Sequence, residues 1–491
     1  MGVATPRHDD RRPPMAQSFY HLAAVDIDAQ PCQGTACFAA RHRNPERWAG
    51  AESADPRVYC LGRCYDAPAR GDDTTEPLVE VACGTAVILG RCAMGGAPDL
   101  RAYLRDGGYQ GLRRALSIGA EATVAEVEAA RLRGRGGAGY PTGRKWRSAR
   151  TGPAGPRVVV VNADEGDAGA YIDRILLEND PHAMLEGLAI AAFAIGAELA
   201  YVYVRREYPR ALAAVRTAVA EAEDAGILGP AAFGRARGVT VTVAQGHGSY
   251  VCGEESALLN ALEGRRPMVR PRPPYPAESG LFGLPTVVNN VETLAGVPWI
   301  LRHGGNEFAA MGSGSSRGTK AVSLNSVFNR PGLYEVEFGI PLREIVDDLG
   351  GGVAGELSGV IVGGPLAGIV PPAHLDVPFA FGPLRDIGAG VGHGGIIAFD
   401  DSTSIVDLVH HVFRFGAYES CGACTPCRVG AARIETLFSR PPARSERGEW
   451  ESIVQTLAAT SLCGHGGGLA DFALSVITHY GKELYGAPTD H

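Results

Sequence analysis

The chain has 491 residues, with 46 basic and 54 acidic side chains and a formal net charge of −8. Its length allows about three or four domains, and its 45% hydrophobic and 20% charged residues are typical of a globular protein. The acidic balance gives no basic surface for nucleic acid, and the longest apolar stretch, Met184–Val204, contains Glu186 and Glu198, which argues against a membrane span.

The N-terminal part divides into a tail and a small cysteine-rich region. Residues 1–17 are rich in Pro, Arg and Asp, which predicts a disordered tail. Residues 18–97 form a predicted small domain, whose cysteines include two closely spaced pairs, Cys32–x4–Cys37 and Cys60–x3–Cys64. Cys83 and Cys92 lack such spacing and are expected to be core or surface thiols. The first residues carry no secretory signal pattern, and ligand-type cysteines fit a reducing compartment, so we expect a cytoplasmic protein.

Helices and strands alternate in the next region. A helical linker over 100–132 leads into buried-strand runs at 157–162 and 201–204 and an alternating strand at 239–243. Helical patterns cover 185–195 and 209–225. The alternation predicts an α/β domain over residues 98–317.

A glycine-rich loop spans Arg131–Trp146. It contains a G-x-G-x-x-G spacing, but a helical pattern precedes it instead of the strand that a Rossmann site requires. Its glycines still allow backbone amides to approach a phosphate or a flat ring, while its cations and its tyrosine offer charge and a stacking surface. The candidate contacts are Gly134, Arg135, Gly136, Gly137, Gly139, Tyr140 and Lys145. A flexible hinge is the alternative interpretation.

Three further polar segments either follow a strand or stand at the start of a helix. The strand at 157–162 ends in an acidic turn, and ligands bind at such strand ends in open α/β sheets. Carboxylates there can accept hydrogen bonds from ribose or ribityl hydroxyls, and paired amides can satisfy a heterocycle edge. The candidates are Asn162, Asp164, Glu165, Asp167, Tyr250, Gly253, Glu254, Glu255, Asn289, Asn290 and Thr293. Each could alternatively be an ordinary helix cap, and Cys252 is expected to pack in the core.

The C-terminal part contains the most specific motif. Short β segments between glycine-rich turns predict a small β-rich domain over 318–401, and helical patterns dominate 402–491. There a C-x2-C-x2-C triplet and one remote cysteine provide Cys421, Cys424, Cys427 and Cys463. Such a set can ligate the four corners of an iron–sulfur cube. A zinc site is the alternative, although zinc usually takes two C-x2-C pairs.

Four strings occur in order: RGRGGAGYPTGRKW, NADEGDAG, SYVCGEESALLNALEG, and ESCGACTPCR with a later SLCG. They make residues 100–485 resemble the flavin-bearing 51-kDa NADH dehydrogenase subunit of respiratory complex I. The chain is also similar to the matching β subunits of NAD-linked molybdenum formate dehydrogenases and NAD-reducing hydrogenases. The Gly-Asp form of the acidic turn at Asp167 looks more like this second branch, because complex I usually has Ser-Glu-Pro-Gly there.

The resemblance implies a multidomain α/β fold and its cofactors. FMN and NADH would bind the 98–317 domain, a β-grasp (SLBB-like) domain would follow, and a C-terminal helical bundle would hold a [4Fe–4S] cluster on its four cysteines. Rings at Tyr140 and Tyr275 would grip the adenine of NADH. The N-terminal pairs resemble the thioredoxin-like [2Fe–2S] domain of the 24-kDa companion subunit, despite a shorter Cys37–Cys60 interval. The implied [2Fe–2S] ligands are Cys32, Cys37, Cys60 and Cys64, with a structural zinc or a vestigial domain as alternatives.

The implied activity is that of a diaphorase subunit. Hydride would pass between NAD(H) and FMN without a catalytic acid or base, and single electrons would pass between FMN and the clusters. The expected partners are a molybdopterin iron–sulfur subunit or hydrogenase subunits, and a small [2Fe–2S] subunit. The alternatives are the NADH dehydrogenase subunit of respiratory complex I itself and, from a different class, a flavin-free iron–sulfur scaffold or redox sensor. The acidic turn favours NAD over NADP because it would repel a 2′-phosphate.

Overall fold

The computed structural model describes residues 21–232 and 238–485, so the tail predicted at 1–17 lies outside the described residues. Its first sheet is parallel, with the strand order β4-β3-β2-β5. The strands are β2 (Val158–Ala163), β3 (Leu199–Val204), β4 (Thr240–Gln245) and β5 (Thr286–Asn290). The three strands predicted at 157–162, 201–204 and 239–243 are thereby confirmed. Because parallel strands end at one edge, the polar segments that follow them meet there.

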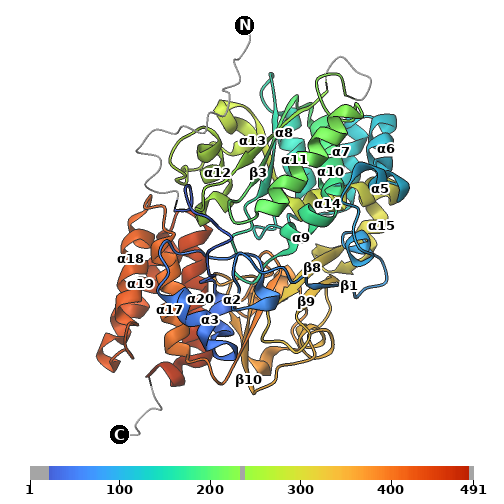
Figure 1. Ribbon diagram of the computed structural model, residues 1–491. Coiled ribbons are helices and arrows are strands. Elements are labelled where there is room, and N and C mark those ends of the chain that lie inside the picture. The colour runs from blue at the N-terminus through green and yellow to red at the C-terminus, as the bar shows by residue number, and fades with distance from the viewer. Residues whose placement is uncertain (1–20, 233–237, 486–491) are drawn as a thin grey trace.

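Helices cover this sheet on both faces (Figure 1). Those in direct contact with its strands include α8 (Thr142–Thr151), α10 (Pro181–Ile195), α11 (Pro209–Asp224), α13 (Pro276–Ser279) and α14 (Val291–His303). The predicted helical linker forms α5 (Leu100–Arg105), α6 (Gln110–Ile118) and α7 (Ala120–Ala129). The remaining helices of this region are α9 (Ile172–Asn179), α12 (Glu255–Leu262) and α15 (Gly305–Ala310).

Glu186 lies in the apolar helix α10, and its charge is satisfied inside the protein. Its carboxylate accepts hydrogen bonds from the Tyr103 hydroxyl (2.5 Å) and from the backbone N–H groups of Tyr109 (2.8 Å) and Leu112 (2.9 Å). The stretch from Met184 to Val204 is therefore a buried helix and a strand, as predicted. Among the described residues, no helix has both the length and the apolarity needed to cross a membrane.

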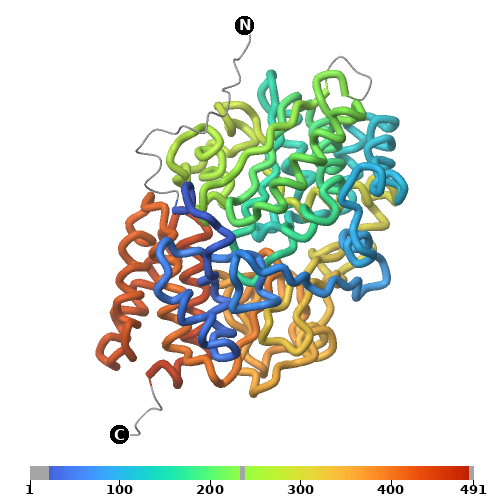
Figure 2. The backbone as a smooth tube through the Cα atoms, viewed as in Figure 1, coloured from blue at the N-terminus to red at the C-terminus, as the bar shows by residue number. Residues whose placement is uncertain are grey.

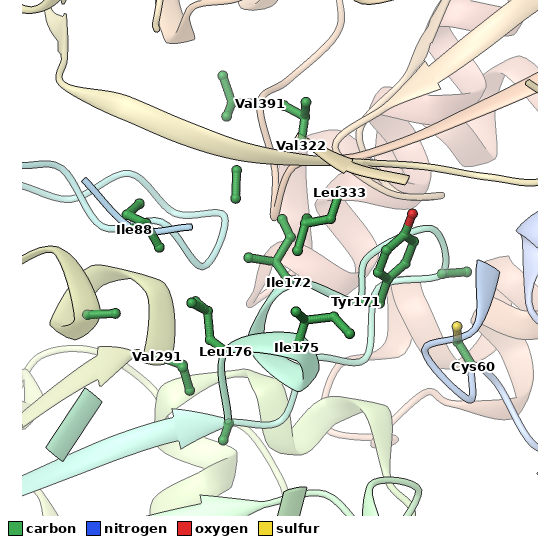
Figure 3. Packing of buried hydrophobic residues seen from close by; sticks show 14 of the residues in the cluster. Cys60, Ile88, Tyr171, Ile172, Ile175, Leu176, Val291, Val322, Leu333 and Val391 are labelled. Atoms are coloured by element: carbon green, nitrogen blue, oxygen red, sulfur yellow. The ribbon is translucent and has the colours of Figure 1, made fainter. Parts of the chain in front are cut away.

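The second sheet is mixed, with the order β1-β9-β8-β12-β10-β11. Its strands are β1 (Leu78–Val81), β8 (Thr319–Leu324), β9 (Gly332–Glu337), β10 (Leu357–Val362), β11 (Ile369–Val370) and β12 (Gly395–Asp400). Below this sheet, Ile172, Ile175 and Leu176 of α9 pack toward Val322 and Leu333 (Figure 3). Helix α9 thus connects the region of the parallel sheet to the mixed sheet.

The N-terminal region does not build the thioredoxin-like domain that the cysteine spacing suggested. Within the described residues 21–97, the elements are the short helices α2 (Thr35–Ala39), α3 (Pro45–Glu52) and α4 (Gly90–Ala93), and β1. The strand β1 pairs in parallel with β9 and so belongs to the mixed sheet. The segment runs between the C-terminal helices and this sheet (Figure 2). A thioredoxin-like fold needs a sheet of its own. The described part of this region contributes one strand, which pairs in the mixed sheet, so it cannot form such a sheet.

Glu335 of β9 fixes the chain that follows β1. Its buried carboxylate accepts N–H bonds from Val87 (2.9 Å), Ile88 (3.0 Å) and Leu89 (2.8 Å), and a bond from the Thr319 hydroxyl (2.6 Å). The N-terminal region is therefore part of the main body of the protein.

The C-terminal part is a bundle of four helices, as predicted. They are α17 (Ile405–Tyr418), α18 (Thr425–Leu437), α19 (Arg447–Thr460) and α20 (Gly464–Tyr485). Cys421 and Cys424 lie at the turn between α17 and α18, Cys427 lies in the first turn of α18, and Cys463 lies between α19 and α20. Both turns are at the same end of the bundle, which brings the four cysteines together.

Candidate functional site

The four C-terminal cysteines line one pocket, whose other walls include the apolar side chains of Val251, Val269 and Leu462. Cys424 is the N-cap of α18, and Cys463 directly precedes α20. The positive ends of two helix dipoles thus lie at the sulfur atoms, which favours an anionic group between them. The donor set and its surroundings fit an iron–sulfur cube.

Burial strongly disfavours free thiolates in this pocket. It raises the pKa of Cys427 to about 12 and that of Cys463 to about 11. Ligands with such pKa values stay ionised at neutral pH only when a metal supplies positive charge. Cys421 and Cys427 are buried, whereas Cys424 and Cys463 are partly exposed, so the pocket has a protein side and a solvent side.

The four N-terminal cysteines form a second quartet, in which each residue is 1% exposed. The Sγ atoms of Cys60 and Cys64 are 3.4 Å apart, and the Cys32 thiol contacts those of Cys37 and Cys60. Each sulfur also accepts one backbone N–H. The donors for Cys32, Cys60, Cys37 and Cys64 are Gly34 (3.4 Å), Gly62 (3.2 Å), Ala69 (3.4 Å) and Gly169 (3.3 Å). Buried sulfurs that all accept N–H bonds are suited to carry negative charge as metal ligands.

The glycine-rich loop lies against the end of β5. A Cβ atom on Gly136 would come within 2.9 Å of the Asn290 Cβ, and Gly139 has a φ of 61° against the Phe381 ring. The backbone N–H of Arg135 donates to Thr293 Oγ1 at 2.9 Å. Glycine is therefore required for this close approach, and the loop is fixed beside the paired asparagines.

The acidic turn after β2 contacts the segment before α12. The Tyr250 hydroxyl donates to Asp167 Oδ1 at 2.6 Å, and Asn162 Nδ2 donates to the Gly253 carbonyl at 2.8 Å. Burial raises the pKa of Asp164 and of Asp167, so this turn disfavours further negative charge. The acidic turn and the segment before α12 therefore lie side by side at the end of β2.

Three predicted contacts have side chains that are engaged inside the protein. The Glu165 carboxylate accepts the backbone N–H groups at the start of α9, including Ile172 at 2.7 Å. Asn289 Oδ1 accepts the Trp146 indole N–H at 2.9 Å. The buried Arg135 guanidinium donates to the Arg317 carbonyl at 2.8 Å. These side chains hold the frame of the site, which the sequence pattern could not distinguish from its lining.

The remaining predicted contacts form an open charged face. Tyr140 and Tyr275 are 53% and 54% exposed. Lys145 Nζ lies 6.0 Å from the Tyr140 ring centroid and 3.3 Å from Glu255 Oε2. Arg272, which the sequence reasoning missed, pairs with Glu254 and lies 3.2 Å from Glu255. Its position three residues before Tyr275 in a Pro-rich loop was the available signal.

A second missed group lies on the buried side of the site. His393, in the loop before β12, is 6% exposed, with its Nε2 at 3.1 Å from Asp173 Oδ2 and 3.4 Å from Glu165 Oε1. A lone histidine in a Gly-rich loop gives no sequence signal of such a role.

Comparison with known proteins matches both halves of this site. Residues 127–299 match the Nuo51 FMN-binding domain, and residues 407–486 match the NADH-ubiquinone oxidoreductase-F iron-sulfur binding region. The chain is 41% identical over 392 residues to an F-type subunit of NADH-quinone oxidoreductase from Rhizobium meliloti (strain 1021), covering 78% of this chain and 93% of that relative. It is 37% identical over 387 residues to NADP-reducing hydrogenase subunit HndC of Solidesulfovibrio fructosivorans, covering 78% and 79%.

The fold also matches a solved structure, an NAD+-reducing [NiFe]-hydrogenase in the H2-reduced state. The TM-score is 0.80 at 30% sequence identity, over 97% of this chain and 88% of the hydrogenase chain. The site and these matches define an NAD(H)-dependent flavin–iron–sulfur oxidoreductase with FMN and a [4Fe–4S] cluster. The chain belongs to the family of the F-type subunits of NADH-quinone oxidoreductase, the 51-kDa flavoprotein family. The zinc alternative for the C-terminal cysteines and the flavin-free scaffold are not supported.

Proposed function

We propose that this chain is the NAD(H)-binding flavin subunit of a cytoplasmic NAD-linked hydrogenase or formate dehydrogenase. A hydrogenase structure matches 97% of the chain, which includes most of the N-terminal region. The Gly-Asp form of the turn at Asp167 agrees with this branch.

The segment η4 (Tyr250–Gly253) is the observation that carries the proposed electron path. It contacts the acidic turn and the end of β2 through its first and last residues, by the Tyr250 hydroxyl and the Gly253 carbonyl. Between these residues, Val251 lines the pocket of the C-terminal cysteines. A flavin at the turn would thus be one short helical turn from the cluster. FMN, when bound, exchanges a hydride with NAD(H) and single electrons with the cluster.

The residues around the turn would hold and orient the nucleotides. We assign the backbone amides of the Gly134–Gly139 loop and Lys145 to phosphate binding. Asn162, Asp164 and Asn290 would take ribityl hydroxyls and the flavin edge, because their polar atoms lie at the strand ends. The exposed rings of Tyr140 and Tyr275 would flank the NADH adenine.

We further propose that the N-terminal quartet holds a [2Fe–2S] cluster. Four buried thiols in contact, each with a backbone N–H donor, support this better than four core thiols would. The donor to Cys64 is Gly169 of the acidic turn, so this cluster would lie beside the flavin site.

The proposed cofactor is NAD and not NADP. Glu254 and Glu255 lie on the open face beside Arg272, and a 2′-phosphate would meet their carboxylates. The partly exposed Cys424 and Cys463 mark the side at which a partner subunit would receive electrons. That partner would be a molybdopterin iron–sulfur subunit, hydrogenase subunits or a small [2Fe–2S] subunit.

The test uses the full chain purified without oxygen. We expect one FMN and about six iron atoms per chain, and reduction of a one-electron dye by NADH but hardly by NADPH. Pure chain without flavin, or inert toward NADH, would refute the proposal. The parent complex is then isolated from native cells, where hydrogen- or formate-dependent NAD+ reduction is expected. A membrane complex that reduces quinone would instead favour complex I.

A further inference from the structure

His393 joins the mixed sheet to the flavin site. It precedes β12, and the nearby Val391 belongs to the same buried hydrophobic cluster as Ile172 at the start of α9. A Cβ atom on Gly394 would come within 3.0 Å of Ile172 Cδ1, so the loop and the helix are in close contact. The imidazole therefore reaches the flavin region from a part of the chain far away in sequence.

The imidazole contacts the carboxylate that holds Asn290. Asp173 Oδ2, at 3.1 Å from His393 Nε2, also accepts the Asn290 amide N–H at 2.6 Å. Asn290 Oδ1 in turn accepts the Thr293 backbone N–H at 3.2 Å. Glu165, at 3.4 Å from the same Nε2, fixes the acidic turn to α9. One side chain thus touches the supports of two segments assigned to the flavin.

The charges around His393 favour its protonated form. Asp173 and Glu165 face the ring, and Asp167 lies farther away on the same turn. Lys320 of β8 donates to the His393 carbonyl at 2.9 Å, but its ammonium is paired with the Glu292 carboxylate. Burial opposes the charged ring, yet the carboxylates of Asp173 and Glu165 outweigh it and raise the pKa of His393 to about 9.

The same three side chains have the composition of a metal site, since their ligand atoms lie within 4.8 Å of one another. The surroundings favour a protonated imidazole over a bound metal ion. The Glu165 oxygens already accept the N–H groups of Ile172, Asp173 and Arg174, and the Asp173 oxygens those of Asn290 and Glu292.

We propose that His393 is a positioning residue for the flavin: its protonated imidazole holds Asp173, and through it the Asn290 amide, in the orientation that binds FMN. This rests on the proposed assignment of Asn290 to the flavin site. FMN affinity should then depend on pH. Because the protonated ring is the form that holds Asp173, FMN binding should weaken as pH rises through the pKa of His393 in the FMN-free protein, about 9.

The test measures the FMN Kd of the purified full chain after flavin removal, by fluorescence quenching between pH 6.5 and 10. For wild type we expect tight binding up to about pH 8 and a rise in Kd beyond it. His393→Gln should bind FMN about ten-fold more weakly at pH 7, as expected for a lost charge-assisted hydrogen bond, and should show no further change with pH. His374→Gln, at an exposed histidine outside this cluster, is the matched control and should behave as wild type.

The outcomes separate the two proposals. Wild type that fails to bind FMN refutes the proposed function. Wild type that binds FMN with a flat pH profile, or His393→Gln with an unchanged Kd, refutes the role of His393 alone. If wild type contains one divalent metal ion per chain and His393→Gln loses it, the three side chains form a metal site and the proposed role of the protonated imidazole is wrong. If His393→Gln does not fold, Asp173→Asn is measured in its place. The pH midpoint of its FMN binding should be lower than that of wild type, and an equal midpoint overturns the proposal.

Discussion

The two cysteine quartets differ in what surrounds them. The C-terminal quartet lies at the ends of four packed helices, and helix N-termini face its sulfurs. The N-terminal quartet lies in loops and short helices, with Cys37 in α2, and its sulfurs are held by individual backbone N–H groups. One of these donors, Gly169, belongs to the flavin region. The first site can therefore be formed by its own helical segment, whereas the second is complete only when two distant regions have docked.

The largest expected effect is at the C-terminal quartet. Cys463→Ser should remove the [4Fe–4S] signal in electron paramagnetic resonance and nearly all electron transfer to a one-electron partner, because the cube loses its fourth ligand. Hydride transfer from NADH to FMN, followed by flavin bleaching, should persist. Cys83→Ser is the control, since that thiol is in neither quartet. An unaltered cube in Cys463→Ser would contradict the ligand assignment.

A change in the N-terminal quartet should spare the other cluster. Cys60→Ser is expected to lower the iron content from about six to about four atoms per chain. The [4Fe–4S] signal should remain. Cys92→Ser, a buried thiol outside the quartet, should keep all the iron. Zinc in place of iron in wild type, or unchanged iron in Cys60→Ser, would show that this quartet holds no iron cluster.

A substitution at Arg205 tests whether the N-terminal site depends on contact with the flavin region. This buried guanidinium donates to the Tyr59 carbonyl at 3.0 Å and pairs with Glu207 at 2.6 Å. Arg205→Gln leaves Glu207 without its cation and should lower the free energy of unfolding by about 3 kcal/mol. It should also make the midpoint potential of the N-terminal cluster more negative, with that of the cube unchanged.

The matched control for this test is Arg210→Gln. Arg210 pairs with Glu76 at 3.1 Å, but both side chains are about half exposed. The loss should therefore be below about 1 kcal/mol, because solvent screens the pair. Equal potential shifts in both clusters of Arg205→Gln would mean that Arg205 is not specific to the N-terminal site.

The smallest effect is expected at the proposed NADH site, from which both clusters receive their electrons. Tyr140→Ala should raise the KM for NADH about three- to ten-fold, as expected when one stacking ring is lost, and Tyr140→Phe should change it little. Because both clusters receive electrons through the flavin, their rates of reduction by NADH should fall equally. A selective effect on one cluster, in stopped-flow spectra, would contradict the common entry point.

The sequence predicted the parts of this protein whose signal is local. The strands predicted at 157–162, 201–204 and 239–243, the glycine-rich loop and the two sets of four cysteines follow from short motifs and periodicity. The thioredoxin-like fold was wrong because cysteine spacing does not reveal that β1 pairs with β9. Glu165 looks like a ligand in sequence, because a carboxylate that caps a helix has the same pattern as one that faces a cofactor. His393 acts through tertiary neighbours, which no local pattern records.

The edge strand β1 also sets a limit on how this chain can be shortened. Removing residues up to Gly96 would open the hydrogen-bonding edge of β9 and leave the Glu335 carboxylate buried without its three amide donors. An open edge invites pairing with other chains, and an unpaired buried carboxylate destabilises the strand that carries it. A minimal flavoprotein cut from this chain would therefore tend to aggregate unless a replacement strand and a new partner for Glu335 were designed together.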